Sequence, residues 1–86
     1  MAERRCWLVE RDYSDKGLVT LVYATPDGER ALRMQRSSNM LARSPVTAAR
    51  DVEAADLQPV ADPGDRERYA GEAARMAERH DPDDEV

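Results

Sequence analysis

Five arginines without acidic neighbours are the residues of this chain best suited to bind a ligand. The segment 30–50 contains no aspartate or glutamate and has a net charge of +5, contributed by Arg30, Arg33, Arg36, Arg43 and Arg50. Guanidinium groups contact phosphates, so the segment predicts a binding site for a nucleic acid or another polyanion. The alternative is that these arginines form ion pairs with the acidic C-terminal third of the same chain or of a second subunit.

The rest of the chain favours the ion pairs. Proteins that bind nucleic acids usually combine a basic overall charge with aromatic side chains among the basic ones. This chain has a net charge of −5, and its segment 30–50 contains no aromatic residue. Polyanion binding is therefore the second interpretation of the arginines.

The other residues that could do chemistry are Cys6, His80 and the acidic residues near the C-terminus. A single cysteine and a single histidine cannot alone form a structural zinc site. The acidic residues lack the glycine and the distal glutamate of a calcium loop, and no phosphate-binding or dinucleotide-binding glycine pattern is present. We expect Cys6 to be a small core residue and His80 to lie at a helix end. The sequence thus predicts no catalytic residue, no metal site and no cofactor, and a protein that is not an enzyme.

Three β-strands joined by two tight turns account for the first 36 residues. Apolar and β-favouring residues predict strands over 3–12, 18–25 and 30–36. Gly17 and Gly28 each close a turn at a position that requires positive φ. The second strand is apolar on both faces, which indicates a central strand that is covered on both sides.

The middle of the chain has weaker signals. Ser38 can cap a short helical turn over 39–43. The segment 46–52 is either a fourth strand or a plain extended segment, and 53–57 predicts one helical or 3₁₀ turn.

One long helix follows. Asp62 is a good N-cap and Pro63 suits the first helical position. One apolar stripe has helical spacing and comprises Tyr69, Ala73, Met76, Ala77 and His80. Arg68 and Arg75 are each spaced for an exposed ion pair with Glu72.

These elements predict an α+β fold, an antiparallel three- to four-stranded β-meander with one C-terminal α-helix packed on it. We expect a single domain over 1–80, followed by an acidic tail over 81–86 that is disordered because it has little to bury.

An apolar sheet face is a second candidate site, this time for self-association. The helix can cover only one face, and the apolar residues assigned to a common face are Trp7, Val9, Val19, Leu21 and Tyr23. If the irregular segment 37–61 does not cover the other face, an apolar surface is left that a second copy of the chain would bury. We therefore expect a homodimer or a complex with another protein.

The composition indicates the kind of cellular environment in which the protein works. The 86 residues divide into 1–29, 30–50 and 51–86 with net charges of −2, +5 and −8, and Lys16 is the only lysine. An acidic surface poor in lysine keeps proteins soluble in concentrated salt, although a GC-rich genome alone would also favour arginine over lysine. No stretch is apolar enough for a membrane span or a signal peptide, and one cysteine suits a reducing cytoplasm.

Three stretches of sequence carry a family resemblance. Residues 7–11 (WLVER), 16–30 (KGLVTLVYATPDGER) and 76–84 (MAERHDPDD) resemble small uncharacterised acidic proteins of halophilic archaea. The resemblance implies a cytoplasmic protein of a salt-rich cell, and it implies no catalytic residue, cofactor or substrate. The sequence does not identify a function; we expect a small non-enzymatic protein-interaction or homodimerising protein of a halophile, with nucleic-acid or polyanion binding through segment 30–50 as the alternative.

Overall fold

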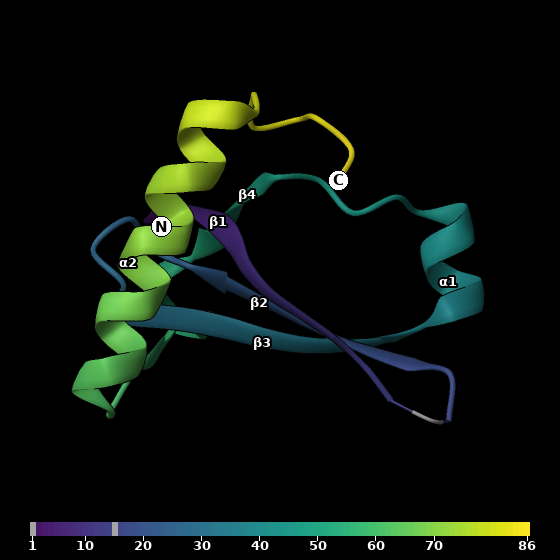
Figure 1. The fold of residues 1–86 in the computed structure, drawn as a ribbon, viewed down its shortest axis with the longest axis horizontal. Coiled ribbons are helices and arrows are strands. Elements are labelled where there is room, and N and C mark those ends of the chain that lie inside the picture. The colour runs from purple at the N-terminus through teal and green to yellow at the C-terminus, as the bar shows by residue number, and fades with distance from the viewer. Residues whose placement is uncertain (1, 15) are drawn as a thin grey trace.

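The structure is a computed structural model that describes residues 2–14 and 16–86. It contains a five-stranded sheet, a short helix α1, a 3₁₀ turn η1 and a long helix α2. Figure 1 shows the two helices and strands β1 to β4. In chain order, the elements are β1 (Glu3–Tyr13), β2 (Leu18–Ala24), β3 (Arg30–Ser37), α1 (Ser38–Arg43), β4 (Ala49–Glu53), η1 (Ala54–Asp56), β5 (Gln58–Pro59) and α2 (Pro63–Arg79). No helix of the described residues is long and apolar enough to cross a membrane.

The predicted α+β fold is confirmed, with more strands than expected. All strand pairs are antiparallel, and the order across the sheet is β4-β1-β2-β3-β5. The segment 46–52 contributes β4, and β5 adds two residues opposite Arg30 and Ala31. The predicted 3₁₀ turn lies between β4 and β5 as η1.

The two predicted turn glycines have the required conformation. Gly17 has φ of 74° and Gly28 has φ of 73°, and no other residue of the described chain has a positive φ. The cap of α2 follows the sequence, since Asp62 accepts a hydrogen bond from the Gly64 amide. For α1, the capping residue is Ser37 and not Ser38 as expected. The Ser38 hydroxyl instead donates to the carbonyl oxygen of Gly17 at 3.0 Å.

The sheet is curled, because two strands that follow each other in the chain lie at its opposite edges. A flat sheet would place β4 and β5 about 19 Å apart, given a strand spacing of about 4.8 Å. The link from Glu53 to Gln58 spans only about 13 Å, because its three residues in η1 advance about 2 Å each and its two extended steps about 3.3 Å each. The edges are therefore drawn together at the η1 end, and Leu57 from this link is buried among the residues of the enclosed face.

Both faces of the sheet are covered within one chain. Inside the curl, the buried residues are Cys6, Leu8, Val19, Leu21, Tyr23, Val46, Val52 and Leu57. On the outer face, α2 covers a second cluster that consists of Trp7, Val9, Val22, Ala24, Ala48, Ala49, Tyr69 and Ala73. Strand β2 supplies three buried residues to the inner cluster and two to the outer one. It is therefore the central strand, covered on both sides, that its sequence predicted.

A β-bulge in β1 sets which side chains share a face. Leu8 lies opposite Tyr23 and Glu10 lies opposite Val22, so Val9 has no partner of its own. Beyond the bulge, Arg11 lies opposite Leu21, and its side chain therefore belongs to the inner face.

The expectation of a single face for Trp7, Val9, Val19, Leu21 and Tyr23 is wrong. Trp7 and Val9 lie on the outer face beneath α2, whereas the other three lie inside the curl. The relative exposure of these five side chains is at most 9%. The surface expected to bind a second copy is therefore buried within the chain, partly by the segment 37–61 that contributes Leu41, Val46 and Leu57 to the inner core.

The segment 81–86 also differs from the expected tail. Ala48 donates its amide to Asp84 O at 2.8 Å, Val86 donates to Val46 O at 2.9 Å, and Thr47 forms a β-bridge with Glu85. The acidic composition conceals this because the segment pairs through its main chain, while alternate side chains face solvent. Arg11 Nη2 donates to the main-chain oxygen of Val86 at 2.8 Å.

Candidate functional site

A hollow of about 400 Å³ lies between the β3 side and the β4 side of the curled sheet. The apolar part of its wall, about half of the lining, includes Leu21, Met34, Met40, Leu41 and Val46. Two guanidinium groups, those of Arg36 and Arg50, complete the wall from opposite strands. The volume lies within the range of about 300–1,000 Å³ that is usual for ligand pockets. We call this hollow the inner cavity.

The two arginines of the inner cavity contact uncharged groups. Arg50 Nη1 lies 3.2 Å from Met34 Sδ, and its guanidinium lies 5.7 Å from the centre of the Tyr23 ring. Arg36 Nη1 donates to Gln35 O at 2.9 Å. Among residues 2–14 and 16–86, no carboxylate lies within ion-pair distance of either arginine. The one acid in the wall, Asp51, accepts a hydrogen bond from Arg5 at 2.8 Å.

Tyr23 is a fixed hydrogen-bond donor in this cavity. Its hydroxyl donates to Thr47 O at 2.9 Å. Burial raises the pKa of the Tyr23 hydroxyl and outweighs the opposite effect of the positive charges of Arg50 and Arg11. The hydroxyl therefore stays neutral and anchors the segment after α1 to the sheet.

The outer edge of β3 borders the inner cavity and has no strand beyond it for most of its length. β5 covers only Arg30 and Ala31, and in the described part of the chain no strand pairs with Leu32–Ser37 on that side. Main-chain groups of alternate edge residues point away from β2 in an antiparallel ladder. Ala31 already pairs with β5, so the outward-facing main-chain groups are those of Arg33 and Gln35. The carbonyl oxygen of Gln35 already accepts from Arg36, which leaves the Gln35 amide and both groups of Arg33 for a further strand.

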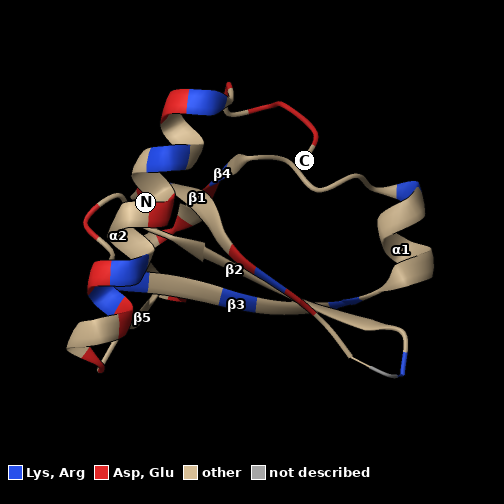
Figure 2. Cartoon of the chain, in the orientation of Figure 1, with Lys and Arg blue, Asp and Glu red and all other residues tan. Residues whose placement is uncertain are grey.

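The five predicted arginines do not form one surface. They lie on β3, α1 and β4, as the basic positions in Figure 2 show. Arg33 faces the outer side and lines a different hollow together with Asp62 and Asp65. Arg43 lies in the last turn of α1, where a cation complements the helix dipole. The ion pairs of the described chain include none of the five, so the expected pairing with the acidic C-terminal third is not formed within this chain.

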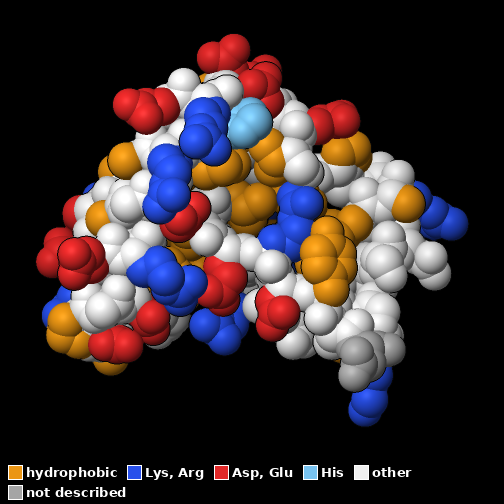
Figure 3. All heavy atoms as spheres, in the orientation of Figure 1, with side chains coloured by type: hydrophobic (Ala, Val, Ile, Leu, Met, Phe, Trp, Pro, Cys, Tyr) orange, Lys and Arg blue, Asp and Glu red, His pale blue; other side chains and the backbone are white. Residues whose placement is uncertain are grey.

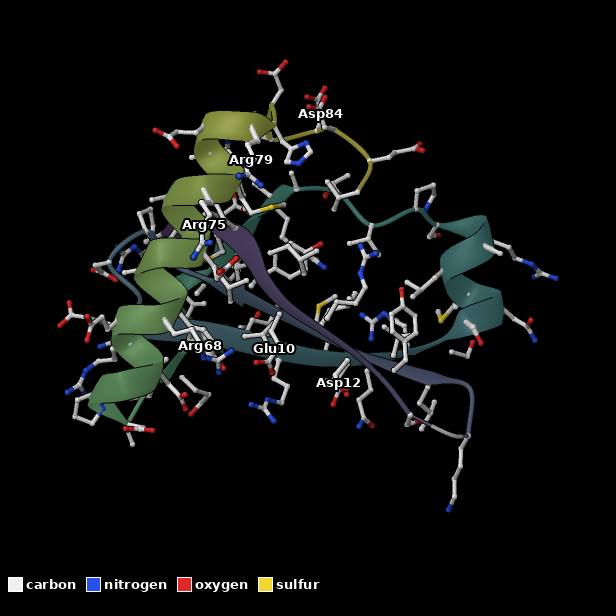
Figure 4. The ribbon with its side chains drawn as sticks, viewed as in Figure 1. Glu10, Asp12, Arg68, Arg75, Arg79 and Asp84 are labelled. Carbon is white, nitrogen blue, oxygen red and sulfur yellow. The ribbon has the colours of Figure 1, made fainter. Side chains whose placement is uncertain are left out.

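Several acidic residues are paired with other arginines. Acidic and basic side chains alternate over α2 (Figure 3). Arg68 points toward Glu10 of β1 (Figure 4), with Nη1 and Oε1 2.8 Å apart, and it also contacts Asp65 at 3.2 Å. The expected pair of Arg68 with Glu72 is wrong, and Glu72 pairs with Arg75 as predicted. Such exposed pairs add little stability individually.

Cys6 and His80 show no arrangement for catalysis. Cys6 is fully buried, burial raises the pKa of its thiol, and its Sγ contacts Arg4 O at 3.6 Å. His80 Nδ1 lies 3.8 Å from Asp84 Oδ2. Within the described residues, no group of three or more histidine, cysteine, aspartate or glutamate side chains could hold a metal ion.

Sequence reasoning missed two features of the structure. The first is the open edge of β3, which becomes visible only when the strand order is known. A second feature that it missed lies outside the inner cavity: Arg11, whose side chain helps to hold residues 81–86 and whose Nε is buried without a partner in the described chain. The sequence did not distinguish Arg11 from the three other basic residues of the same N-terminal third.

The chain belongs to a protein family. The model of the "Family of unknown function (DUF7967)" matches residues 1–86. A search of curated proteins and a search of solved structures found no match.

Proposed function

We propose that the protein is a small non-enzymatic protein-interaction module whose docking surface is the open edge of β3 together with the inner cavity. The observation that supports this most directly is the unpaired edge at Leu32–Ser37 beside two guanidinium groups without carboxylate partners in the described chain. An exposed strand edge is a template for another strand, and many peptide-recognition proteins bind in this way.

The partner is an extended protein segment that carries acidic and apolar side chains. Its main chain would pair with β3, its acidic groups would meet arginine, and its apolar groups would meet the methionine and leucine side chains of the inner cavity. A nucleic acid suits this surface less well, because the arginines are divided between different faces and the net charge is −5.

A second copy of the chain, which the sequence also predicts as a partner, is the alternative. Two copies paired through their β3 edges would bring Arg33 and Arg36 close to arginines of the partner, and like charges across a sheet destabilise it. This repulsion favours a segment of a different protein. Sedimentation at several protein concentrations in high salt distinguishes the two, since only a homodimer changes mass with concentration.

Binding is tested by nuclear magnetic resonance on the ¹⁵N-labelled chain. The probes are capped heptapeptides in which glutamate alternates with leucine, the same peptides with lysine in place of glutamate, and a 12-nucleotide single-stranded DNA. We expect the glutamate peptides to shift the amide signals of Arg33 and Gln35, and the lysine peptides to leave them unchanged. Absence of any shift at the β3 edge with all peptides would contradict the proposal, and shifts with DNA at high salt would favour the polyanion alternative.

We also propose that the protein works in the salt-rich cytoplasm of a halophilic archaeon. The acid excess and the single lysine support this environment. Salt screens repulsion between exposed carboxylates, so the melting temperature is expected to rise between 0.1 and 3 M KCl. A melting temperature that falls over this range would argue against the proposal.

A further inference from the structure

We infer that the inner cavity binds a carboxylate side chain of the partner segment, held between Arg36 and Arg50, while that segment runs antiparallel to β3 in line with β5. The inference rests on the proposed function, because it assumes a strand added at the edge of β3. It goes further by naming the group that is recognised and the direction of the added strand.

The direction of the added strand follows from the position of β5. β5 pairs antiparallel with β3 through Arg30 opposite Pro59 and Ala31 opposite Gln58. The chain leaves this edge at Leu57, whose side chain is buried in the inner core. In the described part of the chain no strand pairs with this edge beyond Ala31, and a second antiparallel segment would continue the line of β5 opposite Arg33–Ser37. Antiparallel pairing is also slightly more stable per residue than parallel pairing.

The alternation of side chains selects which partner residues enter the cavity. Met34 and Arg36 face the inside of the curl and line the inner cavity, whereas Arg33 lines the hollow on the outer side. Residues of an added strand that lie opposite Met34 and Arg36 would face the same side. These two positions would suit an apolar residue and an acidic residue, two places apart.

The charge distribution favours a carboxylate at the acidic position. Arg50 contacts a thioether sulfur, which is a weak acceptor, and the face of the Tyr23 ring. A carboxylate accepts from a guanidinium in a bidentate, charge-assisted arrangement, which is much stronger. Arg36 and Arg50 belong to opposite walls of one cavity, so a single carboxylate between them would link β3 and β4.

The test uses two capped heptapeptides, Thr-Leu-Thr-Glu-Thr-Val-Thr and its glutamine counterpart, titrated into the full chain. In this pattern, leucine, glutamate and valine share one face of the added strand. We expect the glutamate peptide to bind at least about tenfold more tightly than the glutamine peptide, because charged partners strengthen such hydrogen bonds. In R36Q and in R50Q, the two peptides should bind with nearly equal affinity.

R43Q is the matched control, since Arg43 lies on α1 outside the cavity wall. R43Q should keep the full preference for glutamate. The fold of each variant is checked by its amide spectrum and its melting temperature. If either arginine variant unfolds, the other still tests the inference, because each should lower the preference.

The outcomes separate this inference from the proposed function. Equal binding of both peptides at the β3 edge would overturn the carboxylate site and leave strand addition in place. If neither peptide binds, N-acetylglutamate N-methylamide is titrated alone. Shifts of the Arg36 and Arg50 Nε signals would then support the carboxylate site and contradict strand addition, whereas no shift would overturn both.

Discussion

The two turns of the meander have similar sequences but lie in very different surroundings. At the η1 end, Gly28 is buried under α2, and a Cβ on it would overlap Arg66 O and lie 2.8 Å from Ala70 N. At the other end, a Cβ on Gly17 would meet Ser38 Oγ at 3.4 Å and no other atom of the described residues within 4 Å. We call these the closed end and the open end. Turn chemistry is thus the same at both, and the difference comes from the elements that pack on them later in the chain.

The exposure of side chains shows the same contrast. At the open end, Tyr13 and Met40 are 66% and 54% exposed. At the closed end, Thr25 and Leu57 are 0% and 4% exposed. Binding surfaces are commonly found in the less stable parts of a fold, and the inner cavity, with Met40 in its wall, extends toward the open end.

Substitution of the two glycines should give the largest difference in stability between the closed end and the open end. Gly28→Ala places a Cβ into the backbone of α2 and requires positive φ, so we expect a loss of about 4 kcal/mol or more. Gly17→Ala carries only the conformational cost, about 1 kcal/mol. Urea unfolding of both variants measures the difference, and equal losses would show that α2 does not press on the Gly28 turn.

Truncation of one apolar side chain at each end should give the next largest difference in stability. Leu57→Ala removes a buried side chain from the link that closes the curl and should cost about 3 kcal/mol. Met40→Ala removes an exposed one and should cost less than about 0.5 kcal/mol. Comparable losses in urea unfolding would mean that the open end is as well packed as the closed end.

Asp27 at the closed end should make the stability of the protein depend on pH in the acidic range. Hydrogen bonds from the Thr25 hydroxyl and the Glu29 amide lower the pKa of the Asp27 carboxyl. Its contribution is therefore complete above the ordinary value of about 3.9 and is lost as the pH falls through the lowered pKa. Asp27→Asn should cost up to about 1 kcal/mol at pH 7. The difference in stability between the two proteins should shrink as the pH falls below about 3.9, and a constant difference down to about pH 2 would contradict this assignment.

Ser38→Ala should give the smallest effect. It removes the hydrogen bond from the Ser38 hydroxyl to Gly17 O at the exposed open end, which is worth about 0.5 kcal/mol. Hydrogen exchange should be faster at the amide of residue 38, which also donates to Gly17 O. Unchanged exchange there would indicate that the main-chain bond alone fixes α1 to the turn.

Local signals in the sequence predicted most of the elements. Gly17 and Gly28 fixed the two turns, and Asp62 with Pro63 fixed the start of α2, because each acts through its own backbone conformation or through hydrogen bonds to near neighbours. The central position of β2 also followed from its own residues, since both of its faces are apolar.

Relations between distant segments could not be predicted in this way. Alternation within β1 gives two faces, but it does not say which of them Leu21 shares, and the bulge at Val9 changes the alternation. β5 has two residues, one of them Pro59, and carries no strand signal of its own. Arg36 and Arg50 come to one cavity only because the sheet curls, and the composition of segment 30–50 does not distinguish them from its other arginines.

The late position of α2 in the chain has a consequence for folding during synthesis. Residues 3–37 form the three-stranded meander through pairings of low sequence separation, which favours fast association. The outer face of the sheet, which includes Trp7 and Val22, stays uncovered until Tyr69 and Ala73 of α2 leave the ribosome. The nascent meander thus exposes apolar surface for several seconds at the usual rate of about 5–20 residues per second. A chain interrupted before α2 is expected to need a chaperone or to aggregate.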